Sequence, residues 1–249
     1  MVGGLPWCRA LFHGGRVGHT TDETPQNVTP ARTVLGDLSP VVAQSLETVG
    51  LTNHYPTGAL LFGEGQSARG IYVLQRGRVK LWVCASDGRT LILRMVEAGE
   101  VMGVAATIGG REYEASAEAQ EPCEASFVRQ SDVLRMMRVH GEFALWVRQC
   151  LSHDYNATCR EIRTLMLSGS ASEKLARLLV GWLDDHADSS TPGRMKMALT
   201  HEEIGQMIGT SRETVTRLFA GFKKRRLIEQ EGATLVVANR MGLESLIMA

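Results

Sequence analysis

The sequence predicts an α+β chain in three parts: a small antiparallel β barrel or sandwich, one long helix, and a helix-turn-helix closed by a β wing. Three observations predict this order. Short apolar runs separated by glycines fill the region from Leu60 to Arg129. Apolar residues then recur at three- and four-residue steps from Phe143 to Leu165. Finally, two short amphipathic segments are joined by Gly209.

The predicted β-rich domain spans residues 35–130 and follows an extension, residues 1–34, which is expected to be disordered because it is rich in glycine and proline. A short helix is predicted after Ser39, with Pro40 at its first position. Residues 71–74, 79–83 and 90–93 have strand length and β-forming composition. Because Asp87-Gly88 lies between two of these runs, a hairpin is predicted there.

The strand pattern ends near residue 131, and residues 131–168 are predicted to form one long helix. No proline interrupts this stretch, and Gly141 is its only glycine. A helix this long cannot bury its apolar stripe in a compact monomer, so we expect it to pack on its twin in a second chain; a purely internal helix is the alternative. The predicted stripe consists of Phe143, Val147, Leu151, Tyr155, Thr158, Ile162 and Leu165.

The most informative stretch runs from Leu199 to Leu218, within a domain predicted for residues 169–249. Thr200 and Glu203 have the spacing of a capping box at a helix start. Gly209 suits the left-handed residue that ends a helix, and Ser211 can cap the next one. Residues 235–237 then predict a strand, which completes a winged helix-turn-helix.

The outward face of the second helix suits the major groove of DNA. Arginine can donate two hydrogen bonds to guanine, and a carboxylate can accept one from cytosine. The whole chain has a formal net charge of zero, but eight lysines and arginines outnumber three glutamates between Arg194 and Arg226, which favours contact with phosphates. The residues expected to contact DNA are Thr200, His201, Ser211, Arg212, Glu213, Thr216, Arg217, Lys223 and Lys224.

These motifs resemble the Crp/Fnr (cyclic-AMP receptor protein / fumarate-nitrate regulator) family over roughly residues 35–247. The segments EIGQMIGTSRETVTR and LFGEGQSARGIYVLQRGRVKLWV carry the resemblance. It implies a homodimer with a cyclic-nucleotide-binding-like β-roll (a jelly roll, or double-stranded β-helix), a dimerisation helix and a C-terminal winged helix-turn-helix. The implied partners are double-stranded DNA and RNA polymerase. Arg212, Glu213 and Arg217 fall on the positions that read a TGTGA half-site, and Arg212 favours TGTGA over the TTGAT of fumarate-nitrate-type members.

The same resemblance implies an effector other than cyclic AMP, and no cofactor is predicted. The ribose-holding pair of cyclic-AMP-binding members aligns with Gly103 and Val104, and the phosphate-holding pair aligns with Tyr113 and Glu114. Loss of the arginine removes the phosphate's counter-charge, and a glutamate repels an anion. The base-contacting positions align with Cys159 and Arg160. The alternatives are a chain that does bind cyclic AMP or another nucleotide, and a degenerate pocket in which Tyr113 and Glu114 are surface residues.

Redox or metal sensing is a further alternative, because Cys150 and His153 share a helix face. Two ligands are too few for a metal site, so none is predicted. The five cysteines are scattered and form no CxxC pair, which predicts free thiols in a reducing cytoplasm. No nucleophile–base spacing predicts an enzyme. A regulatory module of an enzyme or channel is disfavoured because the second helix of the predicted helix-turn-helix is basic and suits DNA. No apolar run approaches the ~18–20 residues that cross a bilayer, so a cytoplasmic protein without a membrane partner is expected.

Overall fold

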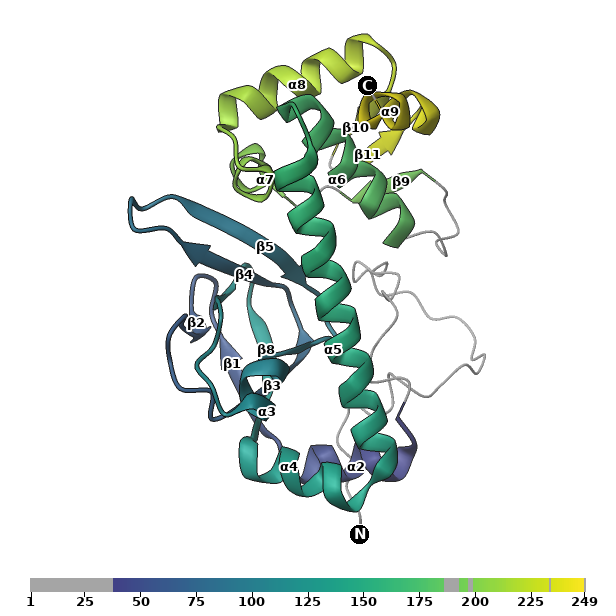
Figure 1. Cartoon of the computed structure of the whole chain (residues 1–249). Coiled ribbons are helices and arrows are strands. Elements are labelled where there is room, and N and C mark those ends of the chain that lie inside the picture. Colours follow the sequence, from purple (N-terminus) through teal and green to yellow (C-terminus); the bar gives the residue numbers. More distant parts are fainter. Residues whose placement is uncertain (1–37, 186–192, 197–198, 233, 249) are drawn as a thin grey trace, which may run out of the picture.

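The computed structural model describes residues 38–185, 193–196, 199–232 and 234–248. The predicted N-terminal extension, residues 1–34, lies outside them. The described chain forms a β-rich N-terminal body and a C-terminal body of helices with a small sheet, and one long helix runs between the two (Figure 1). None of the described helices has the length and apolar character needed to span a membrane.

The β-rich body, called here the β-roll, is built from two four-stranded sheets in which every pairing is antiparallel. The sheet orders are β1-β8-β3-β6 and β2-β7-β4-β5. This confirms the predicted antiparallel β fold. Its elements are α2 (Pro40–Val49), β1 (Leu51–Tyr55), β2 (Leu60–Phe62), β3 (Gly70–Arg76), β4 (Val79–Cys84), β5 (Thr90–Val96), β6 (Val101–Met102), α3 (Val104–Gly109), β7 (Ser116–Ala119) and β8 (Cys123–Arg129).

Small side chains allow the two sheets to approach each other inside the β-roll. Ala117, Ala119 and Ala125 are fully buried in the cluster that fills it. The predicted hairpin is also present, since β4 and β5 are joined by a tight turn in which Gly88 has a φ of 84°. Its tip is fixed by Asp87, whose carboxylate accepts a hydrogen bond from the amide of Arg89 at 3.1 Å.

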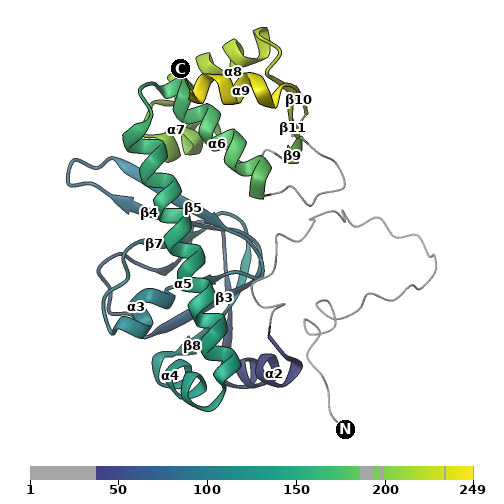
Figure 2. The same ribbon diagram turned by 45° about the vertical axis from the view of Figure 1, so that its right-hand side comes forward.

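The prediction of a single long helix from residue 131 is wrong in one respect, because the structure contains two helices there. Helix α4 (Gln130–Val139) ends before His140, whose backbone is extended, and α5 (Gly141–Ile162) begins after it. The break lets both helices bury a face in one cluster, which Met136 enters from α4 and Trp146 from α5. Helix α5 ends in a π-helical turn, η2 (Arg163–Leu167), and runs from the β-roll to the C-terminal body (Figure 2).

The predicted apolar stripe joins residues from two different faces of α5. Phe143 and Val147 are buried in the protein's own core. Tyr155 and Ile162 are exposed by 70% and 54%. The residues on the outward face are separated by one step of seven and then by alternating steps of three and four, which is the spacing of a coiled-coil contact line. We call this line the exposed seam, although Cys159 in it is half-buried; it consists of Leu145, Ser152, Tyr155, Cys159 and Ile162 of α5 and Met166 of η2.

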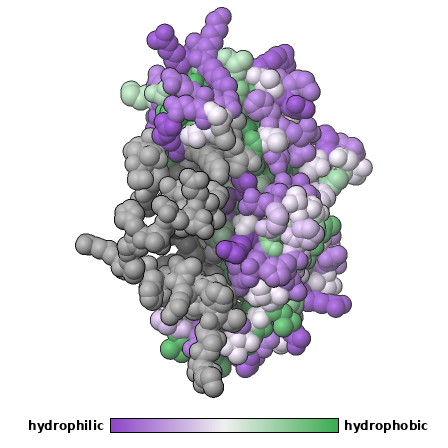
Figure 3. All heavy atoms as spheres, turned by 180° about the vertical axis from the view of Figure 1, so that it is seen from behind, coloured by the Kyte–Doolittle hydropathy of each residue, from purple (hydrophilic) through white to green (hydrophobic). Residues whose placement is uncertain are grey.

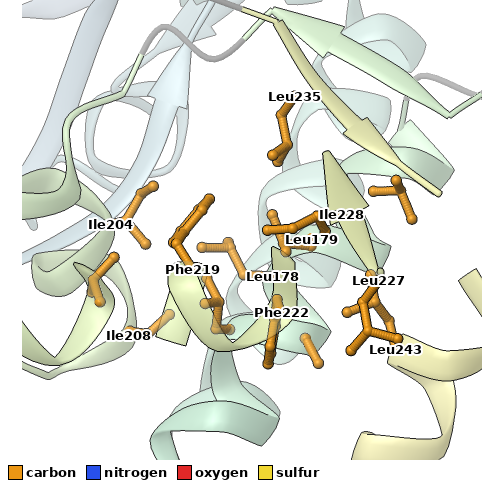
Figure 4. Packing of buried hydrophobic residues seen from close by; sticks show 14 of the residues in the cluster. Leu178, Leu179, Ile204, Ile208, Phe219, Phe222, Leu227, Ile228, Leu235 and Leu243 are labelled. Carbon is orange, nitrogen blue, oxygen red and sulfur yellow. The ribbon is translucent and has the colours of Figure 1, made fainter. Parts of the chain in front are cut away.

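The C-terminal body packs helices around one apolar cluster (Figure 4). Its three-stranded antiparallel sheet has the order β10-β11-β9. A helix pair followed by a two-stranded hairpin confirms the predicted winged helix-turn-helix. On the face seen in Figure 3, hydrophilic residues cover most of its described surface. The elements are α6 (Ala171–Asp185), β9 (Arg194–Lys196), α7 (His201–Ile208), α8 (Arg212–Lys224), β10 (Ile228–Glu231), β11 (Thr234–Val237) and α9 (Arg240–Ile247).

The two bodies touch through the β4–β5 hairpin. Ile92 of β5 is fully buried within the apolar cluster of the C-terminal body, and Trp82 and Met95 pack against the same cluster. Strand β5 contacts α7, the first helix of the helix-turn-helix. The hairpin of the β-roll is therefore part of the packing that supports the helix-turn-helix.

Candidate nucleic-acid interface

Helix α7 begins at a complete capping box. The Thr200 hydroxyl accepts a hydrogen bond from the Glu203 amide at 3.2 Å, and the Glu203 carboxylate accepts one from the Thr200 amide at 2.7 Å. Two backbone donors that would otherwise have no helical partner are thereby satisfied. The capping box fixes where α7 starts and so the position of His201, its first residue.

Replacement of Thr200 by alanine is expected to lower the free energy of unfolding by about 1 kcal/mol, because one cap is lost. Urea denaturation followed by circular dichroism measures this loss. Thr48→Ala is a matched control, since the Thr48 hydroxyl only donates to the Gln44 carbonyl within α2. Equal effects of the two substitutions would contradict a role of the capping box in stability.

The turn between α7 and α8 depends on two glycines. Gly209 ends α7 in the left-handed conformation, with a φ of 65°. A Cβ on Gly205 would lie 2.7 Å from the Thr210 carbonyl oxygen, so only glycine permits this close approach of α7 to the turn. Ser211 then caps α8 by accepting a hydrogen bond from the Thr214 amide at 3.3 Å.

Helix α8 buries one face and exposes the other. Val215 and Phe219 lie in the apolar cluster with Ile204, Met207 and Ile208 of α7. The opposite face carries side chains that are all exposed: Arg212, Glu213, Thr216 and Arg217. Hydrogen bonds from its own amide and from Ser211, together with the nearby arginines, lower the pKa of Glu213. The helix therefore presents ionised donors and an ionised acceptor side by side.

His201 connects α7 to this exposed face. Its Nδ1 lies 2.9 Å from the Thr216 hydroxyl, and its ring stacks on Phe219 with 4.8 Å between centroids. The Thr216 hydroxyl donates to the Arg212 carbonyl at 3.0 Å, so it accepts from His201. Burial, with Lys223 and Arg212 nearby, lowers the pKa of His201 and so favours the neutral ring. His201 thus holds Thr216 in place and leaves Nε2 free as an acceptor.

The far end of α8 carries Lys223 and Lys224, both exposed. Lys223 donates a hydrogen bond to Gln230 of β10 at 2.6 Å, which joins the helix to the wing. Sequence reasoning missed Gln230, because no local pattern relates a strand residue to a lysine seven positions earlier. Thr200, His201 and α8 thus form one surface with the wing beside it.

The six residues aligned with nucleotide-holding positions do not surround a common cavity in the described structure. Gly103 and the buried Val104 begin α3, whereas Cys159 and the exposed Arg160 lie on α5. Glu114 is exposed. Of these residues, only Tyr113 lines a cavity of about 390 Å³ in the β-roll.

Tyr113 is not the surface residue that one alternative predicted, because it is only 5% exposed. Its ring stacks on Phe62 with 4.1 Å between centroids. Its hydroxyl donates to the Gly70 carbonyl at 2.6 Å. Burial raises the pKa of Tyr113, so the hydroxyl keeps the proton that it donates.

Ion pairs connect α5 to the β-roll. Arg94 lies 2.9 Å from the Glu100 carboxylate and 3.3 Å from that of Asp154. Burial raises the pKa of Asp154, and Arg94 acts in the opposite direction. The cavity that Cys150 and His153 share with these groups holds only about 10 Å³, which barely admits one water.

Cys150 and His153 find no further metal ligand there. In the part of the chain that the structure describes, no group of three or more His, Cys, Asp or Glu side chains could hold a metal ion. The four described cysteines form no disulfide with one another in this structure.

Comparison with known proteins places these two bodies in known families. Residues 52–140 match the cyclic nucleotide-binding domain, and residues 173–246 match the Crp-like helix-turn-helix domain. The cAMP-activated global transcriptional regulator CRP of Pasteurella multocida is 28% identical over 184 residues, which are 74% of this chain and 88% of the relative. The transcriptional activatory protein AadR of Rhodopseudomonas palustris is 24% identical over 196 residues, 78% of this chain and 80% of the relative.

Solved structures show the same fold. FixK2 from Bradyrhizobium japonicum superposes with a TM-score of 0.70 at 21% identity, covering 81% of this chain and 98% of its own. CooA from Carboxydothermus hydrogenoformans gives a TM-score of 0.69 at 20% identity, with 89% and 97% covered. The first domain match covers β2 to β8 of the β-roll, and the second covers α7, α8 and the wing. The chain therefore belongs to the Crp/Fnr family of DNA-binding transcription regulators.

Proposed function

We propose that the protein is a homodimer that reads a palindromic TGTGA-like DNA site and responds to an effector other than cyclic AMP. The observation that carries the proposal is the first turns of α8, which expose Arg212, Glu213 and Arg217 together. In a helix-turn-helix these turns contact base edges. The proposed functional parts are residues 35–130 for effector sensing, 131–168 for dimerisation and 169–249 for DNA binding, with RNA polymerase as a further partner.

The exposed seam supports the homodimer. Tyr155, Ile162 and Met166 are exposed by 70%, 54% and 76%, although they are large apolar residues. Their coiled-coil spacing lets a second copy of α5 cover them from end to end. A parallel pair of α5 helices gives the two α8 helices the two-fold relation that a palindromic site requires.

The environment of Tyr113 supports an effector other than cyclic AMP. A cyclic phosphate needs a cationic partner in a pocket of low polarity. The Tyr113 hydroxyl is instead engaged by the Gly70 carbonyl, and Glu114 beside it is anionic. Adding cyclic AMP is therefore expected to leave DNA affinity unchanged.

Alanine substitution of Arg212 or Arg217 is expected to weaken binding to a TGTGA palindrome by about 1–3 kcal/mol per half-site and to relax specificity at one base pair. Fluorescence anisotropy on the palindrome and on variants with one base pair changed per half-site measures both effects, with and without cyclic AMP. Lys224→Ala is the control, since a phosphate contact is lost equally on every sequence.

Three outcomes would count against the proposal. If the arginine variants lose affinity equally on all sequences, the arginines contact only phosphates. If wild-type protein shows no preference for the palindrome, the half-site assignment is wrong. If cyclic AMP raises the affinity strongly, Tyr113 and Glu114 do not disable the nucleotide site.

A further inference from the structure

A cavity of about 390 Å³ lies in the β-roll, away from the DNA-binding surface. Its volume lies in the range of small-molecule sites. Four of its lining residues are aromatic, and they come from separate segments: Phe62 from β2, Tyr72 from β3, Phe127 from β8, and Tyr113 from the segment before β7. The cavity is therefore created by the fold rather than by one local motif.

The four rings form one continuous aromatic surface. Phe62 and Tyr113, exposed by 6% and 5%, are stacked at its floor. The centroid of Tyr72 lies 5.3 Å from that of Phe62 and 5.0 Å from that of Phe127. Tyr72 and Phe127 are half-buried, so parts of their rings are accessible to a ligand.

Gly70 holds this surface in position. A Cβ on Gly70 would lie 2.7 Å from the Phe127 ring, so only glycine leaves room for that ring. The Gly70 carbonyl also accepts the hydrogen bond from Tyr113. Both rings are thus fixed before a ligand arrives, which lowers the ordering cost of binding.

The rim of the cavity is polar and positively charged. It is formed by Gln66, Ser67 and Arg69, and no carboxylate lines the cavity. Arg69 is exposed, and its guanidinium has no ion-pair partner among the described residues. The side-chain Oε1 of Gln66 accepts a hydrogen bond from the Gly63 amide, which leaves the side-chain Nε2 of Gln66 available as a donor. An anionic group suits this rim, and a cation does not.

We infer that this cavity binds a small planar aromatic acid, whose ring lies against Tyr72 and Phe127 and whose carboxylate pairs with Arg69. The inference deepens the proposed function, because it names the effector class. Of the six residues aligned with nucleotide-holding positions, only Tyr113 belongs to this cavity. The cavity therefore adjoins the position implied by the alignment, since Gly103 packs against the Tyr113 ring, but it uses other side chains.

Isothermal titration calorimetry of the full chain with benzoate, phenylacetate and indole-3-acetate tests the inference. At least one acid is expected to bind. Its non-aromatic and uncharged counterparts are expected to bind at least about tenfold more weakly; for phenylacetate these are cyclohexylacetate and 2-phenylethanol, respectively. Arg69→Gln is expected to weaken the acid about tenfold or more. Tyr72→Leu is expected to reduce the preference for the aromatic acid.

Arg89→Gln is the matched control, because Arg89 is an exposed arginine at the hairpin tip, outside the cavity, and pairs there with Asp87. It is expected to bind the acid as wild type does. Failure of all three acids at millimolar concentration, or equal affinities of the Arg69→Gln variant and wild type, would overturn the inference. DNA binding without the acid is measured in parallel, and Arg69→Gln is expected to leave it unchanged. If the wild-type protein shows no specific DNA binding in this parallel measurement, the proposed function is contradicted instead.

Discussion

Replacement of Ile162 by aspartate is expected to convert the proposed dimer into monomers and to reduce affinity for the proposed palindrome by orders of magnitude. Ile162 lies on the exposed seam, where a second copy of α5 would bury it. The substitution places two like charges opposite each other in an apolar interface, at a cost of several kcal/mol. Each monomer would then hold only one half-site. Sedimentation velocity measures the association state, and anisotropy measures the DNA affinity.

Gln149→Asp provides the control for charge. Gln149 is exposed on α5 beside the seam, so the same negative charge there should stay in water. This variant is expected to remain a dimer and to bind DNA as wild type does. A monomeric wild type, or an Ile162→Asp variant that dimerises with unchanged affinity, would show that α5 does not form the interface.

Replacement of Gly70 by alanine is expected to destabilise the β-roll by about 3 kcal/mol, because β3 and β8 would have to separate. An added Cβ would lie 2.1 Å from the Val128 carbonyl oxygen, and a backbone atom cannot move aside as a flexible side chain can. Urea denaturation followed by circular dichroism measures the loss.

Gly181→Ala is the matched control for this substitution. Gly181 lies within α6, and a Cβ there would have no neighbour within 4 Å. Alanine is the better helix former, so this variant is expected to be as stable as wild type or slightly more stable. An unfolding midpoint of Gly70→Ala equal to that of wild type would show that the strands adjust freely at this point.

Features set by neighbouring residues could be predicted from the sequence. The hairpin at Asp87-Gly88, the capping box at Thr200 and the end of α7 at Gly209 each depend on a few adjacent positions. The winged helix-turn-helix was predictable for the same reason. The outward face of α8 followed from the helical period alone.

Features set by distant contacts could not be predicted in this way. The break at His140 lets Met136 and Trp146 share one core, and nothing in the local sequence states that contact. The faces of α5 were misassigned because Phe143 and Tyr155 are both apolar, and only the fold decides which is covered. The aromatic cavity was missed entirely, since its four rings lie on segments far apart in the chain.

The docking of Ile92 into the C-terminal core sets a minimum free-energy cost for any conformational change that separates the two bodies. Withdrawal of β5 from the DNA-binding helices would expose a fully buried isoleucine, at a cost of about 1.5–3 kcal/mol. A ligand that drives the bodies apart must recover that free energy through its preference for the separated arrangement. The ligand must therefore bind the separated arrangement about 10- to 150-fold more tightly than the docked one before half of the molecules are separated.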